Sequence, residues 1–249
     1  AAAAAVLLLP RLLSAEVAPP TGRWHAVLAP VPGLEVAFGL KVEGKAGKLA
    51  GALVNGASES RFTSVSWDGE TLTLALDHYD GKLVARVDGA ALSGTFVRAI
   101  PTGRIELPFR ATRGAPPAPK PPKGSPAIAG DWGVEMGEGE KSSRLLGTFR
   151  QRGGEAFGTL LGSTGDFGPM HGTWDGKALV LTVFDGVFVY RLDGALGEDG
   201  TLSGTFRSRS GVPSPWKARR LDAAGAAAWL PGGSSLVRAK DPAARVAFS

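Results

Sequence analysis

The sequence predicts an all-β protein made of two homologous antiparallel units, and three observations lead to this expectation. Turn residues are abundant, with 36 glycines and 18 prolines among 249 residues, and they recur roughly every eight to twelve positions, which is typical of many short strands. Apolar and polar residues alternate between the turns, as in strands with one buried face. One ordered set of motifs occurs twice. We therefore expect a β-barrel or sandwich, as two small barrels or one larger closed sheet.

The composition excludes several classes of site. The chain has no cysteine, so it holds no disulfide, thiolate metal site or cysteine nucleophile. A chain of this length buries roughly 70–75% of its unfolded surface, which is enough to fold on its core alone. The formal net charge is +5, with basic residues spread along the chain. The nearest approach to a nucleic-acid patch is Lys217, Arg219 and Arg220 beside Trp216, and we expect no nucleic-acid binding.

Residues 1–18 are expected to be the remnant of a secretory signal. The run from Ala1 to Leu13 is almost wholly apolar and leads through small residues into Pro19-Pro20, which is typical of the end of a signal peptide. A transmembrane helix needs about 20 apolar residues, and Pro10-Arg11 interrupts this run. We therefore expect an exported protein, periplasmic or secreted, with no membrane span in the mature chain.

The internal repeat defines the expected domains, 20–113 and 128–222. Each opens on Gly-x-Trp, continues through Trp-Asp-Gly, Asp-Gly and an Arg-apolar-Asp-Gly-Ala run, and closes on Leu-Ser-Gly-Thr-Phe. In the two units these motifs begin at Gly22 and Gly130, Trp67 and Trp174, Asp80 and Asp185, Arg86 and Arg191, and Leu92 and Leu202. The proline-rich segment 114–127 cannot enter a sheet and is expected to be an extended linker. Residues 223–249 are expected to be a connector, with a short helix over 222–230.

Each unit is expected to be a meander of about five or six strands. Asp68-Gly69 and Asp175-Gly176 are predicted as two-residue hairpin turns, so that Trp67 pairs with Glu70 and Val65 with Leu72. Alternation then places Leu72, Leu74 and Leu76 on one face, and Leu179, Leu181 and Val183 beside Trp174 and Met170. The strands of the first unit are expected near 22–29, 34–42, 48–54, 60–67, 70–78, 82–88 and 91–98. Glycines within strands indicate bulges or bends, at Gly51, Gly94, Gly158 and Gly204.

The search for chemistry assigns no catalytic, cofactor-binding or metal-binding residue, and no cofactor is expected. The three histidines, His25, His78 and His171, fall at unrelated points of the repeat, whereas a metal site needs ligands close together. Carboxylates of the Asp-Gly pairs could serve acid–base chemistry on a glycan, but Asp before Gly is what tight turns require. The repeated tryptophans are interpreted as core residues rather than sugar-stacking platforms; they are Trp24, Trp67, Trp132 and Trp174. Arg86 and Arg191 are expected to pair with turn carboxylates.

Several stretches resemble the N-terminal β region of bacterial TlpA-like thiol–disulfide oxidoreductases. They are Phe157 to Phe167, Leu181 to Gly186, Gly200 to Gly204, Leu53 to Gly56, and Trp67 to Leu74. In that family an exported β region precedes a thioredoxin-like domain with a Cys-x-x-Cys pair, and the approach to that domain is similar to Asp241 to Ser249. The redox cysteines have no counterpart in this chain. The resemblance implies a non-catalytic accessory β module, whose partners are a C-terminal thioredoxin-like domain or protein substrates.

Two alternatives from other classes remain open. One is a stand-alone β-barrel that binds an apolar or glycan ligand between its sheets, which requires an apolar cavity of about 300 Å³ or more. The other is a structural or envelope-interaction domain without a small ligand.

Overall fold

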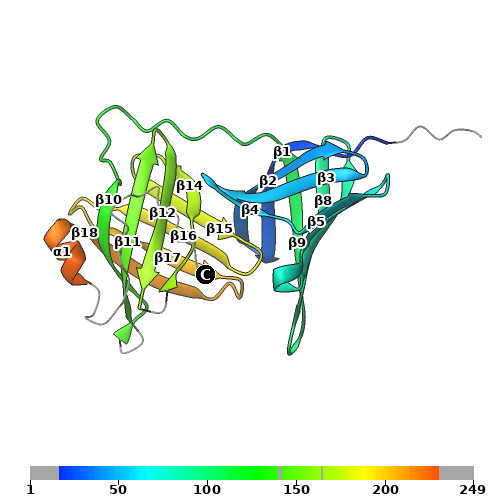
Figure 1. Ribbon diagram of the computed structural model, residues 1–249. Coiled ribbons are helices and arrows are strands. Elements are labelled where there is room, and N and C mark those ends of the chain that lie inside the picture. Colours follow the sequence, from blue (N-terminus) through cyan, green and yellow to red (C-terminus); the bar gives the residue numbers. More distant parts are fainter. Residues whose placement is uncertain (1–16, 140–141, 164, 230–249) are drawn as a thin grey trace, which may run out of the picture.

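The computed structural model describes residues 17–139, 142–163 and 165–229. Two β units lie side by side, and a short helix, α1 (Ala223–Trp229), packs on the far end of the second (Figure 1). The prediction of an all-β fold with a short C-terminal helix is confirmed. Within the described ranges, no helix is long and apolar enough to cross a membrane. The signal expected at 1–18 lies outside the described residues except for Val17 and Ala18, and so does the connector from 230 onward.

The first unit is a curled, open sheet of nine antiparallel strands. Its strand order is β4-β3-β2-β1-β9-β8-β7-β6-β5. A short 3-10 helix, Asp77–Tyr79, joins the sixth strand to the seventh. The strands are β1 (Gly22–Val31), β2 (Leu34–Lys45), β3 (Lys48–Asn55), β4 (Ser58–Arg61), β5 (Ser64–Trp67), β6 (Thr71–Leu76), β7 (Gly81–Asp88), β8 (Ala91–Ile100) and β9 (Gly103–Arg113).

The second unit repeats this order of strands but closes into a barrel. Pairing of β11 with β12 joins the two ends, so that eight strands form a complete ring and the two-residue β13 extends β12. Closure satisfies the backbone groups that an open sheet leaves at its edges. The strands are β10 (Gly130–Met136), β11 (Ser143–Arg152), β12 (Glu155–Gly162), β13 (Gly165–Asp166), β14 (Met170–Trp174), β15 (Ala178–Phe184), β16 (Val189–Leu196), β17 (Leu202–Ser208) and β18 (Pro213–Leu221).

The first unit stays open at a seam between its two edge strands, β4 and β5. The chain crosses this seam, but the two strands do not pair with each other. The single strand expected over 60–67 is wrong: it is broken at Phe62 and Thr63 into β4 and β5, which form opposite edges of the sheet. The Phe62 N–H donates to the Gly51 carbonyl (3.0 Å) and the Thr63 N–H to the Ala75 carbonyl (2.8 Å). These two consecutive residues therefore bond to strands on either side of the seam. In the second unit, β14 pairs with both β12 and β15 and closes the ring.

The turn predicted at Asp68-Gly69 is longer than expected. Trp67 pairs with Leu72 rather than Glu70, because the Asp68 carboxylate accepts hydrogen bonds from the backbone N–H groups of Glu70 and Thr71 (2.9 and 2.7 Å). This local capping stabilises a four-residue loop. The pairing shifts by two residues, so the faces are unchanged and the leucines of β6 are buried as predicted. The same loop follows Trp174, which pairs with Leu179.

Two further expectations about the strands are corrected. Strand β9 lies outside the ranges expected for the first unit, and each unit has nine strands rather than five or six. The glycines at matched positions, Gly94 and Gly204, are not bulges, since pairing continues through both without a shift. A Cβ at Gly94 would overlap the Val84 carbonyl, and one at Gly204 would overlap the Asp193 carbonyl. These glycines therefore permit close approach of the neighbouring strand.

One arrangement recurs where the first and last strands of each unit pair. Trp24 and Trp132 are buried, and each indole N–H donates to the carbonyl four residues earlier (3.2 and 2.9 Å). An arginine of the last strand covers each ring, Arg113 at 4.4 Å and Arg220 at 4.6 Å from the ring centroid. Trp174 is also fully buried, whereas Trp67 is only partly buried. The interpretation of the repeated tryptophans as core residues is therefore correct for Trp24, Trp132 and Trp174, and Trp67 packs only partly against the core.

The segment between the units runs along the outside of both (Figure 1), without a strand over 114–129. Its second half contacts the barrel: the Trp174 indole donates to the Pro126 carbonyl (3.1 Å), and Ile128 is buried in the barrel core.

The hydrophobic core of the first unit includes residues of the second. Phe184 and Val189, which flank the β15–β16 turn of the barrel, are buried among the core residues of the first unit. The Phe184 ring lies edge-on to Phe96 at a centroid distance of 4.9 Å. At the same junction Asn55 donates to the Phe184 carbonyl (2.9 Å), and the Thr182 hydroxyl donates to the Ala37 carbonyl (2.7 Å). The units are thus coupled through buried groups rather than joined only by the linker.

Candidate functional site

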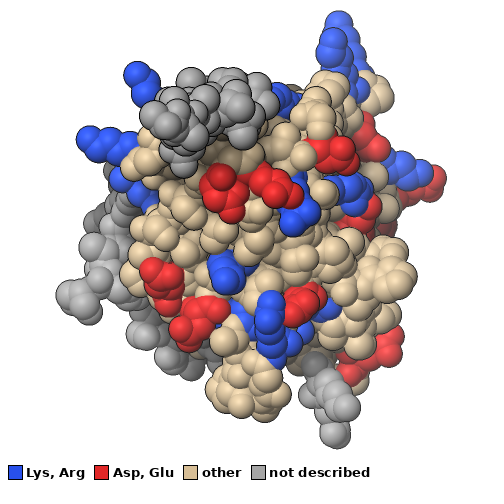
Figure 2. All heavy atoms as spheres, turned by 90° about the vertical axis from the view of Figure 1, so that its right-hand side faces the viewer, with Lys and Arg blue, Asp and Glu red and all other residues tan. Residues whose placement is uncertain are grey.

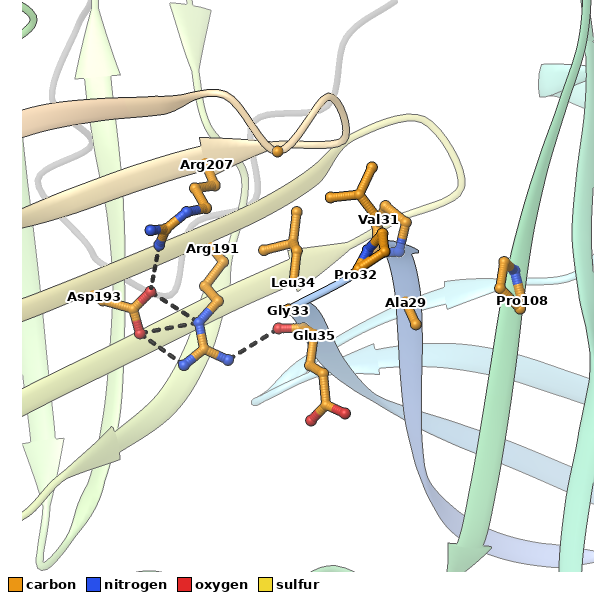
Figure 3. Close-up of a pocket in the computed structure, with 12 residues that line it drawn as sticks. Ala29, Val31, Pro32, Gly33, Leu34, Glu35, Pro108, Arg191, Asp193 and Arg207 are labelled. Atoms are coloured by element: carbon orange, nitrogen blue, oxygen red, sulfur yellow. Dashed lines mark hydrogen bonds and ion pairs between the residues drawn. The ribbon is translucent and has the colours of Figure 1, made fainter.

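A pocket of about 920 Å³ lies where the two units meet. One wall is the turn between β1 and β2 together with Pro108 of β9, and the other is formed by β16, β17 and the turn after β17. Figure 3 shows the charged side chains on the barrel side facing the hairpin of the first unit. The volume is within the range of small-molecule sites. The lining residues are Ala29, Pro30, Val31, Pro32, Gly33, Leu34, Glu35, Pro108, Arg191, Asp193, Arg207 and Gly211.

Arg191 and Asp193 form the fixed part of the charged wall. Both project from the same face of β16, two residues apart, and Arg191 Nε and Nη2 donate to the Asp193 carboxylate at 2.7–2.9 Å. Hydrogen bonds to Asp193 raise the pKa of Arg191 above its ordinary value, so this guanidinium stays charged. Its Nη1 also donates to the Glu35 carbonyl across the unit boundary (3.0 Å). Arg191 therefore ties the pocket wall to the first unit.

Arg207 on the neighbouring strand is held more loosely. Its Nη1 is 3.6 Å from Asp193 Oδ2, which is beyond hydrogen-bond distance. The Glu35 carboxylate is paired with Arg110 at 2.7 Å and points away from Arg207 in Figure 3. The charged wall thus contains the hydrogen-bonded ion pair of Arg191 with Asp193 and, beside it, the more loosely held guanidinium of Arg207.

The same motif has a different structure in the two units. The Arg-apolar-Asp-Gly-Ala run of the first unit ends in the turn before β8, and Arg86 pairs with the loop residue Glu70 (3.1 Å), as predicted. In the second unit five additional residues separate Asp193 from the Leu-Ser-Gly-Thr-Phe motif, so the run lies within β16. Arg191 therefore pairs with a strand aspartate instead of a turn carboxylate, which corrects the expectation for this residue.

A second pocket, of about 460 Å³, lies at one end of the barrel. It is lined by the ends of β10, β11 and β12 with Phe167 and Phe206, whose rings contact edge-on at 5.5 Å. Side chains fill the barrel interior below it, among them Trp132, Phe149 and Trp174. An eight-stranded barrel is just wide enough for such filling. The pockets described above therefore lie between the units and at the barrel end, not between packed sheets.

Two of the three histidines come closer together than their places in the repeat indicate. Burial is the largest cause of the lowered pKa of His171 of β14, and a charge on His25 of β1, across the unit boundary, adds a smaller lowering. Burial is also the main cause of the lowered pKa of His25. In the described part of the chain, no group of three or more His, Cys, Asp or Glu side chains is placed to hold a metal ion.

The Asp-Gly carboxylates serve as turn residues. Backbone N–H groups of the following residues lower the pKa of Asp68 and of Asp175. A general acid for glycan cleavage needs a raised pKa instead. The geometry therefore agrees with the interpretation of both as structural aspartates.

The basic stretch of β18 is engaged in contacts within the protein. Lys217 pairs with Glu135 (3.0 Å), Arg219 lies over Trp229, and Arg220 donates to the Ala129 carbonyl. On the side of the first unit, acidic and basic side chains are interspersed (Figure 2). Neither surface shows the single-sign stripe that marks a nucleic-acid site.

The pocket between the units contains residues that sequence analysis did not single out. The repeat points to Arg191, but Asp193 belongs to an Asp-Gly pair that predicts a turn, and no motif marks Glu35 or Arg207. A signal was present in Pro30-Val31-Pro32-Gly33, an apolar turn with two prolines in a sequence whose other turns are rich in Asp and Gly. An apolar turn of this kind needs a neighbouring surface to cover it.

Comparisons with known proteins give little similarity. No protein family model matches the chain, and no curated protein matches it. Among solved structures, a protein of Bacteroides fragilis described as a candidate outer membrane protein aligns with 80% of this chain and 95% of its own, at 13% identity and a TM-score of 0.27. A score this low carries no argument about function or location.

Proposed function

We propose that this chain is a non-catalytic accessory β module of an exported thioredoxin-like thiol–disulfide oxidoreductase. Two features of the sequence support the proposal: the apolar N-terminal run, which favours export, and the motifs from Phe157 onward that resemble the TlpA-like β region. The role we assign to the module is to hold the catalytic domain and its protein substrate in a defined relation.

The structural observation that carries this proposal is the docking of α1 on the barrel. Trp229, in the last turn of α1, is 8% exposed and donates its indole N–H to the Leu145 carbonyl (2.9 Å). The guanidinium groups of Arg144 and Arg219 lie over its ring at 5.1 and 5.3 Å. The chain therefore leaves the barrel from a point that is fixed by packing.

The coupling of the two units supports the same role. Since Phe184 and Val189 are buried in the core of the first unit, the units move together and form one platform instead of two independent domains. A platform of this kind can orient an attached domain at a small entropic cost.

The decisive test is the reading frame beyond Ser249. We expect it to continue into a thioredoxin-like domain with a Trp-Cys-x-x-Cys motif, and a natural stop codon there would refute the proposal. The purified chain alone should not reduce insulin disulfides, because it has no cysteine. Insulin reduction by this chain alone would contradict the proposed division of roles.

In the longer protein, Trp229→Ala tests whether docking of α1 matters for function. We expect a several-fold loss in the rate of reduction of a protein disulfide, with the rate toward glutathione disulfide unchanged, because only a large substrate depends on domain orientation. Phe188→Ala, an exposed aromatic truncation on the β15–β16 turn, is the matched control. Equal rates for all three proteins on both substrates would show that the module does not position the catalytic domain.

A second candidate function is a stand-alone binding protein, and the pocket between the units favours it. A ligand held inside the barrel is disfavoured because Trp132, Phe149 and Trp174 fill that interior. The stop codon that would refute the first proposal is the result that this alternative expects.

A further inference from the structure

We propose that the pocket between the two units binds the carboxylate group of an apolar organic acid, with Arg207 as the anion-binding residue. The inference concerns residues of this chain alone and is independent of whether a thioredoxin-like domain follows Ser249.

The charged side chains on the barrel side of the pocket include one more positive charge than negative charges. Asp193 accepts three hydrogen bonds from Arg191, and these neutralise its carboxylate. Arg207 then adds a second positive charge beside a carboxylate that is already paired. The Glu35 carboxylate does not supply the missing anion, because it is bound to Arg110. The local net charge of the Arg191, Asp193 and Arg207 group is therefore +1.

The donors of Arg207 are available to a ligand. Among the described residues the Arg207 guanidinium has no hydrogen-bond partner, and its ion pair with Asp193 is 3.6 Å long. Its side chain is 35% exposed and lines the pocket. Guanidinium groups bind carboxylates through two parallel N–H···O bonds, a geometry that requires two neighbouring donors to be free. Arg207 meets this requirement, whereas Arg191 does not.

The opposite wall of the pocket is apolar and therefore favours a ligand whose remaining part is hydrocarbon. Val31, Pro32 and Pro108 present an apolar surface to the pocket beside the buried Leu34, with Gly211 of the barrel against the Val31 side chain. Contact between water and this apolar surface is unfavourable. Displacement of that water by a hydrocarbon group of a ligand is therefore favourable. A ligand with a hydrocarbon body and a single anionic end matches both walls. A polyanion does not match, since among the described residues that line the pocket Arg207 alone has a guanidinium without a hydrogen-bond partner.

The first test uses two dyes that differ only in their charged group. Anilinonaphthalene sulfonate carries an anion on an aromatic body, and N-phenylnaphthylamine is the same body without it. We expect Arg207→Gln to weaken binding of the sulfonate by roughly 10–100-fold, which is the value of a charged hydrogen bond, and to leave binding of the neutral dye unchanged. Arg86→Gln, which removes an equal charge from an exposed site, should bind both dyes as the unmodified protein does.

The second test establishes the carboxylate. Octanoate should displace the sulfonate dye, and octylamine, with the same chain and the opposite charge, should not. Arg207→Lys keeps the charge but loses the paired donors, so its affinity for octanoate should lie between those of the unmodified protein and Arg207→Gln, while binding of the neutral dye stays unchanged and shows that the variants fold. In the unmodified protein, octanoate should shift the backbone amide NMR signals of Gly33 and Gly211, which line the two sides of the pocket.

Three results would overturn the proposal. They are equal affinity of Arg207→Gln and the unmodified protein for the sulfonate dye, equal competition by octylamine and octanoate, or octanoate shifts confined to residues away from Gly33 and Gly211. The first would show that Arg207 is not the anion-binding residue, the second that charge does not select the ligand, and the third that binding occurs elsewhere.

Discussion

Phe184 of the barrel packs edge-on against Phe38 of the open sheet, with ring centroids 4.8 Å apart and ring planes at 64°. The phenylalanine ends β15 and directly follows Val183, which faces the barrel core, so its side chain points out of the barrel, yet it is fully buried. The first unit therefore completes its core with a side chain from the second. This relationship has direct consequences for stability.

Phe184→Ala should destabilise the protein by about 3–5 kcal/mol, the usual cost of removing a buried aromatic ring. Urea unfolding followed by tryptophan fluorescence measures the change. Phe188→Ala, four residues further along the same turn and 40% exposed, should cost less than about 1 kcal/mol. Equal effects of the two substitutions would contradict a shared core.

Asn55 makes the polar contact beside this ring. Its side-chain amide donates to the Phe184 carbonyl at 2.9 Å in a buried position. Asn55→Ala leaves that carbonyl without its partner and should cost about 1–3 kcal/mol. Thermal unfolding is a sufficient measurement, with Ser64→Ala as an exposed control. A melting temperature unchanged by Asn55→Ala would show that water replaces the amide without loss.

Gly133 and Trp229 form a testable pair at the α1 docking site. A Cβ at Gly133 would lie 2.7 Å from the Trp229 ring, so Gly133→Ala should displace the helix and destabilise the protein by about 1–3 kcal/mol. In a Trp229→Ala background the same substitution should cost much less, because the obstructing ring is gone. A double-mutant cycle measures the coupling. Strictly additive effects would mean that the helix does not pack on Gly133.

The stability of the protein should fall as the pH drops through about 6.5. Burial lowers the pKa of His171 and of His25 in the folded state below the ordinary value of 6.5. The unfolded chain then binds more protons in this window, and protonation favours unfolding. The contribution is complete above the unfolded pKa and is lost as the pH falls below it. Glu155, 3.9 Å from the His171 imidazole, opposes the shift, whereas Arg152 adds to it.

Free energies of unfolding between about pH 8 and about pH 5 check this expectation. His171→Gln should reduce the slope, and Ser64→Ala, an exposed substitution that removes no titratable group, should leave it unchanged. An identical slope in all three proteins would exclude His171 as its source.

Much of the local structure follows from the sequence because it depends on neighbouring residues. The alternation of Leu72, Leu74 and Leu76, the position of the turn after Trp67 and the alanine-rich helix all appear where the pattern placed them. The length of that turn does not, because backbone hydrogen bonds to Asp68 compete with the two-residue hairpin. The alternation in β9 was also present in the sequence, but Pro108 within it argues against a strand.

The repeated motifs by themselves determined that this protein is all-β, that its units are homologous and that the Asp-Gly pairs after Trp67 and Trp174 form turns, since these properties depend on local periodicity and turn chemistry. Only the tertiary structure decided that one unit closes while the other remains open, that Phe184 belongs to the core of the first unit, and that Arg191, Asp193 and Arg207 face an apolar hairpin across a pocket. The physical reason is that both features depend on tertiary contacts. The units meet through residues more than a hundred positions apart, such as Asn55 with Phe184, and closure of the ring depends on whether strands such as β12 and β14 pair across the seam, which no local pattern encodes.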